Sequence, residues 1–280
     1  MVPTGSGCDA WHNMHKEHEQ LLQSRRDLKA KLRGRKRVFG SWTSIGHPIL
    51  TEIMLRAGFD FHGIDIEHST ISQEQSQRII AASHSLSTPC LPRIASHNME
   101  MIKRLLDSGA DGIIVPMVST QDEIANVGTW IKYPPGGQRS FGISKAQGYG
   151  FDFFDYTATW NESSIAIVQI ENIAGVRNID RLLDNEFLDG VMIGPYDLSG
   201  SLNIPGQIDH PEVQKACETV IEACSKAGKA CGTQVIEMTL PAIEKGFSSG
   251  FTFEVLSSDI FLLWKWADQV GQLISNARKA

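Results

Sequence analysis

The sequence contains no long apolar segment, and its negative charge exceeds its positive charge. No stretch reaches the roughly 18 consecutive apolar residues that a membrane-spanning helix needs, so we expect no contact with a membrane. The first 37 residues are polar and lack the apolar centre of a signal peptide, which predicts a cytoplasmic protein. With 26 Lys and Arg against 32 Asp and Glu, the net charge of −6 argues against a general nucleic-acid partner.

Cysteine is sparse as well. The five cysteines are Cys8, Cys90, Cys217, Cys224 and Cys231, and no two of them have the CxxC spacing. Their odd number and their positions within apolar segments predict reduced core thiols rather than disulfides or a structural zinc site. The chain of 280 residues, with 41% hydrophobic residues, is long enough to bury a sizeable core in one large domain or two small ones.

Residues 1–36 differ in character from the rest of the chain. A flexible start precedes a polar stretch that is typical of a charged helix, with three histidines at His12, His15 and His18. Histidines at this spacing diverge around a helix, so we expect a solvated face rather than a metal site. For the basic run 25–37 we expect a solvated helix end, with contact to a phosphate or an acidic partner surface as the alternative. We therefore predict that residues 1–36 form a helical extension of a catalytic domain at 37–280.

From residue 37 onward, short apolar and β-branched runs alternate with longer stretches of helical periodicity. The eight predicted strands are 37–44, 59–67, 88–94, 111–118, 164–171, 188–195, 229–235 and 251–257. Eight βα units in one domain of this length predict an α/β fold, the (β/α)8 or TIM barrel. One long irregular stretch, 134–163, follows the fourth predicted helix, and a loop of that length is typical of a lid or an active-site wall.

Polar side chains gather where the predicted strands end. The four strand ends are Glu67 and His68, Pro92 and Arg93, Gln169 to Glu171, and Gly194 to Asp197. In a TIM barrel these ends converge on one mouth, where the chemistry takes place.

The residue types at this mouth suit one class of reaction. Carboxylates at Glu171 and Asp197, without cysteine, favour a hard divalent cation such as Mg²⁺ or Mn²⁺. Arg93 offers a fixed fork for a carboxylate or an oxyanion, and His68 can transfer a proton near neutral pH. Together these groups indicate enolate chemistry on a small 2-oxo acid.

The motifs "GIDIEH", "PRI" with "KRLLDSGADGIIVPMV", "YPPGGQRSFGISKAQGYG", "VQIEN" and "GVMIGPYDLSGS" resemble the HpcH/HpaI family of metal-dependent pyruvate aldolases. The resemblance covers roughly residues 37–260. It implies a class II aldolase, a carbon–carbon lyase that reversibly cleaves a 4-hydroxy-2-oxo acid to pyruvate and an aldehyde through an enolate held on a metal ion. Oxaloacetate decarboxylation, or condensation of the citrate-synthase kind, could use the same residues and is the alternative. A non-catalytic barrel is a third reading, against which the intact set of polar strand ends argues.

The resemblance also implies roles for single residues. Glu171 and Asp197 would bind the metal ion, which would be Mg²⁺ or Mn²⁺, with Co²⁺ as a further option, and Gln169 would lie beside the bound oxo acid. Gly194 and Tyr196, beside Asp197, fall where family members hold the pyruvate carboxylate with backbone amides, and Pro195 between them would line the same substrate site.

Two further roles concern the reacting atoms. Arg93 would polarise the keto oxygen, while His68 and Asp107 would form a base dyad acting through water. For Asp107 only the resemblance points to catalysis, because the residue itself ends a predicted helix in "RLLDSG". The sequence departs from the family pattern at "EHST" and at "FTFEVLSSDI", so it leaves the acceptor aldehyde undefined.

The last predicted helix, 259–280, carries an unusually broad apolar surface. Its large apolar residues include Ile260, Phe261, Leu262, Leu263, Trp264 and Trp266. One face of a surface helix cannot bury all of them, and soluble proteins seldom leave such a patch exposed. We therefore expect a homo-oligomer, and the resemblance implies a trimer-based homohexamer in which this helix is exchanged between subunits.

Overall fold

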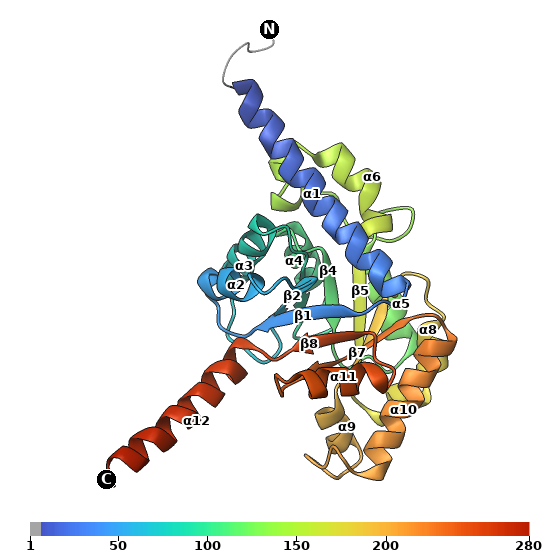
Figure 1. Cartoon of the computed structure of the whole chain (residues 1–280). Coiled ribbons are helices and arrows are strands. Elements are labelled where there is room, and N and C mark those ends of the chain that lie inside the picture. The colour runs from blue at the N-terminus through green and yellow to red at the C-terminus, as the bar shows by residue number, and fades with distance from the viewer. Residues whose placement is uncertain (1–6, 280) are drawn as a thin grey trace.

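Eight parallel strands form a closed barrel in which each strand pairs with its neighbours in the sequence, and β8 pairs with β1 (Figure 1). The computed structural model describes residues 7–279, with side chains from residue 19 onward. The strands are β1 (Val38–Thr43), β2 (Phe61–Asp65), β3 (Cys90–Arg93), β4 (Gly112–Val115), β5 (Ile165–Ile170), β6 (Gly190–Ile193), β7 (Ala230–Val235) and β8 (Phe253–Leu256). All eight lie within the ranges expected from the sequence, which confirms the predicted TIM barrel.

Helices precede, connect and follow the strands, and most of them cover the barrel from outside. They are α1 (Gly7–Arg33), α2 (Pro48–Leu55), α3 (Gln73–Ser85), α4 (Met99–Asp107), α5 (Gln121–Ile131), the 3-10 helix η1 (Lys145–Gly150), α6 (Phe153–Ser163), α7 (Ile173–Arg177), α8 (Ile179–Leu183), α9 (Pro195–Ser201), α10 (Pro211–Lys226), α11 (Leu240–Ser248) and α12 (Asp259–Ala277). Local capping explains several of their starts. Ser72 and Thr120 each form a capping box with the residue three positions later, which satisfies backbone N–H groups that a helix leaves free.

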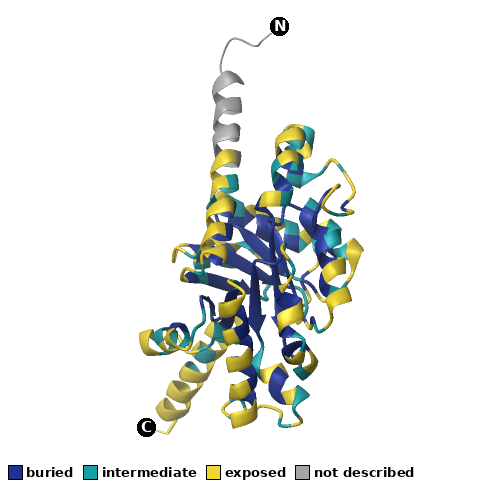
Figure 2. Cartoon of the chain, turned by 90° about the vertical axis from the view of Figure 1, so that its right-hand side faces the viewer, coloured by how far each residue is buried: buried dark blue, intermediate teal, exposed yellow. Residues whose placement is uncertain are grey.

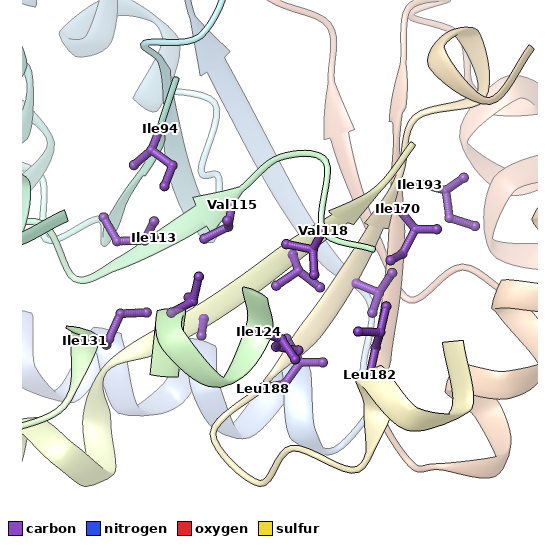
Figure 3. Packing of buried hydrophobic residues seen from close by; sticks show 14 of the residues in the cluster. Ile94, Ile113, Val115, Val118, Ile124, Ile131, Ile170, Leu182, Leu188 and Ile193 are labelled. Carbon is purple, nitrogen blue, oxygen red and sulfur yellow. The ribbon is translucent and has the colours of Figure 1, made fainter. Parts of the chain in front are cut away.

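Strand side chains alternate between the barrel interior and the helix layer. One buried cluster fills the interior and includes Phe61, Leu91 and Phe253. The other joins the outer faces of the strands to the helices, as the contacts around Val115 and Ile124 illustrate (Figure 3). Burial is accordingly highest in the strands and lowest on the outer surfaces of the helices (Figure 2).

The same alternation carries polar side chains to the mouth. β2 and β3 are in register with Asp65 opposite Arg93, so two charged groups share one level at the ends of neighbouring strands. Gln169, near the end of β5, is also buried. The interior is therefore apolar along most of its length and polar at the carboxyl ends of the strands.

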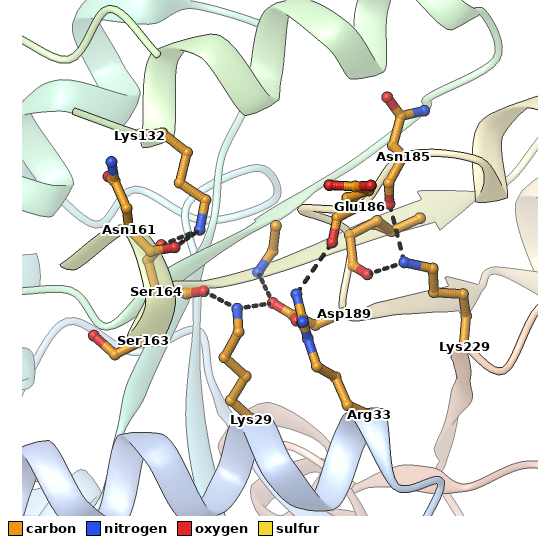
Figure 4. Close-up of polar contacts among 12 residues, drawn as sticks. Lys29, Arg33, Lys132, Asn161, Ser163, Ser164, Asn185, Glu186, Asp189 and Lys229 are labelled. Carbon is orange, nitrogen blue, oxygen red and sulfur yellow. Dashed lines mark hydrogen bonds and ion pairs between the residues drawn. The ribbon is translucent and has the colours of Figure 1, made fainter. Parts of the chain in front are cut away.

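The second half of α1 closes the opposite end of the barrel. Leu28 and Leu32 belong to the interior cluster, and Lys29 and Arg33 both contact the Asp189 carboxylate, at 2.9 Å and 2.8 Å (Figure 4). Lys29 also donates to the backbone carbonyl of Ser164. The expectation of a solvated basic helix end was therefore wrong for this part of the run, since its cations meet acids of the barrel itself. The three histidines at positions 12, 15 and 18 lie outside the residues whose side chains are described.

The segment 134–163 also differs from the expectation. It is not irregular throughout, because it contains η1 and α6, and Trp160 of α6 is fully buried and donates to the Ile131 carbonyl. It leads from a helix into the start of β5, and such connections lie at the amino-terminal end of a TIM barrel. Within one chain it therefore does not form a lid or wall over the mouth.

Helix α12 extends away from the barrel instead of packing on it (Figure 1). Asp259 anchors its start by accepting from the Thr43 hydroxyl and from the backbone N–H groups of Ser44 and Ile45. Beyond Asp259 no described residue of this helix is buried. Its apolar side chains are consequently left without a covering surface in a single chain.

Two compositional expectations can be compared with the fold. The four cysteines with described side chains, at positions 90, 217, 224 and 231, are buried and unpaired, as predicted for core thiols. Cys8 lies outside the described side chains. A search of the described part of the chain found no helix with the length and hydropathy needed to cross a membrane.

Candidate active site at the carboxyl ends of the strands

Arg93 is held rigidly at the mouth of the barrel. Its Nη2 lies 2.8 Å from Asp65 Oδ1, its Nε lies 3.2 Å from Glu67 Oε2, and its guanidinium carbon lies 5.0 Å from the centre of the Trp42 ring. Only 13% of the Arg93 side chain is exposed. Two acids and an aromatic face thus fix the orientation of one guanidinium fork, as expected for a group that must point at a reacting oxygen.

Asp65 organises this corner and was given no role by the sequence reasoning. Besides binding Arg93, its Oδ1 accepts from the backbone N–H groups of Glu67 and His68, at 3.1 Å and 3.0 Å. These bonds fix the turn that carries both residues out of β2. The signal in the sequence was the alternation of β2, which places Asp65 on the interior face at the last position of the strand.

Glu171 follows β5 and is almost completely buried at 4% exposure. Its Oε2 accepts from the Met117 backbone N–H at 3.0 Å, and its Oε1 accepts from Gln169 Nε2 at 2.9 Å. Gly194 allows the chain at the end of β6 to approach closely, because a Cβ there would lie 2.8 Å from Glu171 Cγ. The carboxylate is therefore fixed by three neighbouring strand ends.

The electrostatic environment of the mouth disfavours the ionised form of its own carboxyl groups. Burial, together with the Asp197 and Glu67 carboxylates, raises the pKa of Glu171 to about 7, although the Met117 N–H and Arg93 oppose this rise. Burial also raises the pKa of Glu67, against the attraction of Arg93 and His68 and with support from the repulsion of Asp65 and Asp197. The negative charges of Glu67, Glu171 and Asp197 thus repel one another, and the single positive charge of Arg93 does not neutralise all three.

This arrangement fits a divalent cation. Gln169 Oε1 is buried and has no hydrogen-bond partner in the described part of the structure, while the buried Glu67 Oε2 contacts only the side chains of Arg93 and His68. Buried oxygens seldom stay unpartnered, and a cation would balance the carboxylates around them. Among the described residues no three His, Cys, Asp or Glu side chains form a ready-made metal site. Glu171 and Asp197 would supply two ligands and leave the remaining positions to water and substrate, as a catalytic metal requires.

The other predicted residues at the mouth are more exposed. His68 has 67% of its side chain exposed, and its Nε2 lies 3.7 Å from Glu67 Oε2. Tyr196 and Asp197 are exposed in the first turn of α9, after Gly194 and Pro195. Backbone N–H groups in a first helical turn have no partner within the helix, so they face any anion bound at this end.

Asp107 does not join this group within a single chain. It is the last residue of α4, which returns from the mouth to the amino-terminal end of the barrel. There its Oδ1 binds Arg139 Nη2 at 2.9 Å. The structure therefore brings together Arg93, Gln169 and Glu171, places His68 and the start of α9 around them, and leaves Asp107 at the other end.

Comparisons with known proteins agree with this geometry. The sequence profile of the HpcH/HpaI aldolase/citrate lyase family matches residues 39–263. The hydroxypyruvate/pyruvate aldolase of Roseobacter denitrificans is 36% identical over 81% of this chain and 88% of its own length. The 2-keto-3-deoxy-L-rhamnonate aldolase of Salmonella typhi is 35% identical over 84% of this chain and 88% of its own length.

A solved structure shows the same likeness. The HpcH/HpaI aldolase/citrate lyase family protein of Burkholderia cenocepacia superposes with a TM-score of 0.83 at 28% identity, over 89% of this chain and 99% of that one. The motifs at the strand ends, the closed barrel and these similarities support a single assignment. The chain belongs to the HpcH/HpaI aldolase/citrate lyase family.

Proposed function

We propose that this protein is a carbon–carbon lyase that reversibly cleaves a 4-hydroxy-2-oxo acid to pyruvate and an aldehyde. The observation that carries the proposal is the fixed Arg93 guanidinium beside the buried Glu171 carboxylate and the buried Gln169 Oε1, which has no hydrogen-bond partner among the described residues, all at one barrel mouth. The family assignment and the aldolase names of its relatives support it.

Glu171 and Asp197 are proposed to hold a divalent metal ion, with Mg²⁺ or Mn²⁺ favoured by their oxygen ligands. When bound, such an ion supplies a Lewis acid for the carboxylate and keto oxygens of a 2-oxo acid. Met117 and Gln169 hold Glu171 in one orientation by their hydrogen bonds. As a metal ligand, the Glu171 carboxylate therefore needs little rearrangement when the substrate arrives.

Arg93 is proposed to stabilise the negative charge that develops on the keto oxygen as the C3–C4 bond breaks. Its guanidinium is already oriented by Asp65, Glu67 and the Trp42 ring, so the stabilisation needs little reorganisation. The backbone N–H groups of Tyr196 and Asp197, in the first turn of α9, are proposed to bind the substrate carboxylate.

His68 is proposed to take the proton of the 4-hydroxyl group, directly or through one water molecule. Its exposed ring can reach a substrate above the mouth, and the turn that carries it is fixed by Asp65. A contribution of Asp107 to this step would have to come from a second copy of the chain, because α4 ends at the opposite end of the barrel.

The decisive test of the activity is an assay of pyruvate release from a 4-hydroxy-2-oxo acid, such as 4-hydroxy-2-oxopentanoate. We expect release by the purified protein, its loss after treatment with EDTA and its return on addition of Mn²⁺ or Mg²⁺. Release that continues unchanged in the chelated protein would contradict the metal-dependent mechanism.

We further propose that the protein assembles as a trimer-based homohexamer through α12. Trp264 and Trp266 are 59% and 62% exposed, and on the barrel Ile49 and Ile53 of α2 are 53% and 63% exposed. Apolar surfaces of this kind are normally covered in a soluble assembly.

Light scattering should give a mass well above the 30.9 kDa of one chain. Trp264→Glu should lower this mass, whereas Lys279→Glu, at an exposed position just beyond the end of the same helix, should not. A wild-type monomer would refute the assembly and leave the assay of pyruvate release unaffected.

A further inference from the structure

A second cavity lies at the end of the barrel opposite the mouth. It has a volume of about 330 Å³ and lies between α1, the end of α3, the chain that enters β4, η1 and α6. Its charged and titratable walls are Arg25, His84, Asp111 and Lys145, and Leu21 and Leu22 contribute apolar surface. This volume is in the range of small-molecule sites in proteins.

Among the lining residues whose side chains are described, the one carboxylate, Asp111, already has partners for both of its oxygens. Asp111 Oδ1 lies 3.3 Å from Arg25 Nη1, while Oδ2 lies 2.8 Å from His84 Nε2 and 2.9 Å from the backbone nitrogen of Cys90. Although burial opposes its charge, His84, Arg25 and the Cys90 N–H together hold the pKa of Asp111 below its usual value. Asp111 is thus a stable anion whose charge is balanced by Arg25.

Lys145 is left as a cation in excess. It is half-buried, and within the described residues its Nζ makes neither a hydrogen bond nor an ion pair. Burial lowers the pKa of Lys145, and Asp111 offsets part of this effect. Once Arg25 balances Asp111, Lys145 is the cation that the described lining residues leave uncompensated.

We propose that this cavity binds a small phosphate monoester. A phosphate ester carries roughly −1.5 to −2 charge near neutral pH, which complements the positive charge of Lys145. Lysine binds phosphate as a point charge, whereas Arg25 pairs with Asp111 through Nη1 and stacks over Tyr156 and Trp160. The leucines of α1 offer an apolar wall for the carbon part, which favours an ester over free phosphate.

The cavity is separate from the proposed active site. Its walls come from α1 and from segments that precede strands, whereas Arg93 and Glu171 lie at the carboxyl ends of strands. The binding of a phosphate ester here is therefore independent of the proposed aldolase activity, and each can be tested without the other.

Isothermal titration of the full-length protein with glycerol 3-phosphate tests the site. We expect saturable binding by the wild type, and Lys145→Ala should weaken it at least about tenfold, as expected for the loss of a charge-assisted hydrogen bond. Lys145→Arg should restore most of the affinity, because it keeps the positive charge. Lys36→Ala, an exposed lysine near the same end of the barrel, is the matched control and should bind like the wild type.

Two further arms identify the ligand and the location. Neutral glycerol should not bind, and inorganic phosphate should bind more weakly than the ester. Arg93→Ala at the mouth should leave binding of glycerol 3-phosphate unchanged. The proposal fails if the wild type shows no saturable binding, if a folded Lys145→Ala binds as tightly as the wild type, if free phosphate binds as tightly as the ester, or if Arg93→Ala abolishes binding.

Discussion

Metal binding at the mouth should compete with protonation of Glu171. A ligand carboxylate must be ionised to bind a metal ion, but burial and the neighbouring acids raise the pKa of Glu171 to about 7. For a single group with this pKa, the apparent metal affinity should fall about tenfold between pH 8 and pH 6. Over the same range, the protons released per bound ion should rise from about 0.1 to about 0.9.

Isothermal titration with Mn²⁺ in two buffers of different protonation enthalpy measures both quantities on the same protein. Glu171→Gln should bind Mn²⁺ weakly and lose most of the pH dependence, because the titrating ligand is gone. Glu218→Gln, on the exposed face of α10, should behave like the wild type. An affinity independent of pH, or a pH dependence unchanged in Glu171→Gln, would refute the role given to this carboxylate.

Three other predictions follow from the structure. Arg93→Lys should lower kcat by about 10²- to 10³-fold, because an ammonium group lacks the oriented fork of a guanidinium. The control Arg104→Lys, at an exposed position, should have no effect on kcat. A near-normal kcat in Arg93→Lys would contradict the proposed stabilisation of the keto oxygen by Arg93. His68→Ala should abolish aldol cleavage but spare oxaloacetate decarboxylation, which needs no base at a hydroxyl group; equal loss of both would indicate a structural histidine. The side-chain oxygens of Glu254 have no hydrogen-bond partners among the described residues, and burial raises the pKa of this carboxyl group to about 7. Ionisation of Glu254 therefore destabilises the folded state as the pH rises from about 4.5 to 7. Glu254→Gln should therefore raise the free energy of unfolding by about 2 kcal/mol near pH 8 and leave it almost unchanged at about pH 4, as urea titrations can measure.

The positions of the strands and most of the mouth could be predicted because both depend on local pattern. A buried parallel strand is a short apolar run, and its polar end marks the mouth, as at Arg93 and Glu171. Asp65 and Glu67 also stand at a strand end in "GIDIEH", but their roles depend on the Arg93 side chain of the neighbouring strand. Only the register of β2 and β3 shows that contact.

The contacts of α1 could not be predicted from its own sequence. Its basic run resembles any solvated helix end, since the partners of Arg25 and Lys29 are Asp111 and Asp189, far away along the chain. By contrast, the position of Asp107 follows from topology alone, because a helix that follows a barrel strand returns to the opposite end. The resemblance suggested a role for this residue, while the connectivity separates it from the mouth of its own chain.

The central claim is that the mouth formed by Arg93, Glu171 and Asp197 performs metal-dependent carbon–carbon cleavage. It is tested most directly by kcat/KM for pyruvate release from 4-hydroxy-2-oxopentanoate at saturating Mn²⁺, in Glu171→Gln and in Glu218→Gln. We predict a loss of at least about 10²-fold in Glu171→Gln, the size typical for removal of one key transition-state stabiliser, and wild-type activity in Glu218→Gln. Wild-type activity in a folded Glu171→Gln would contradict the account.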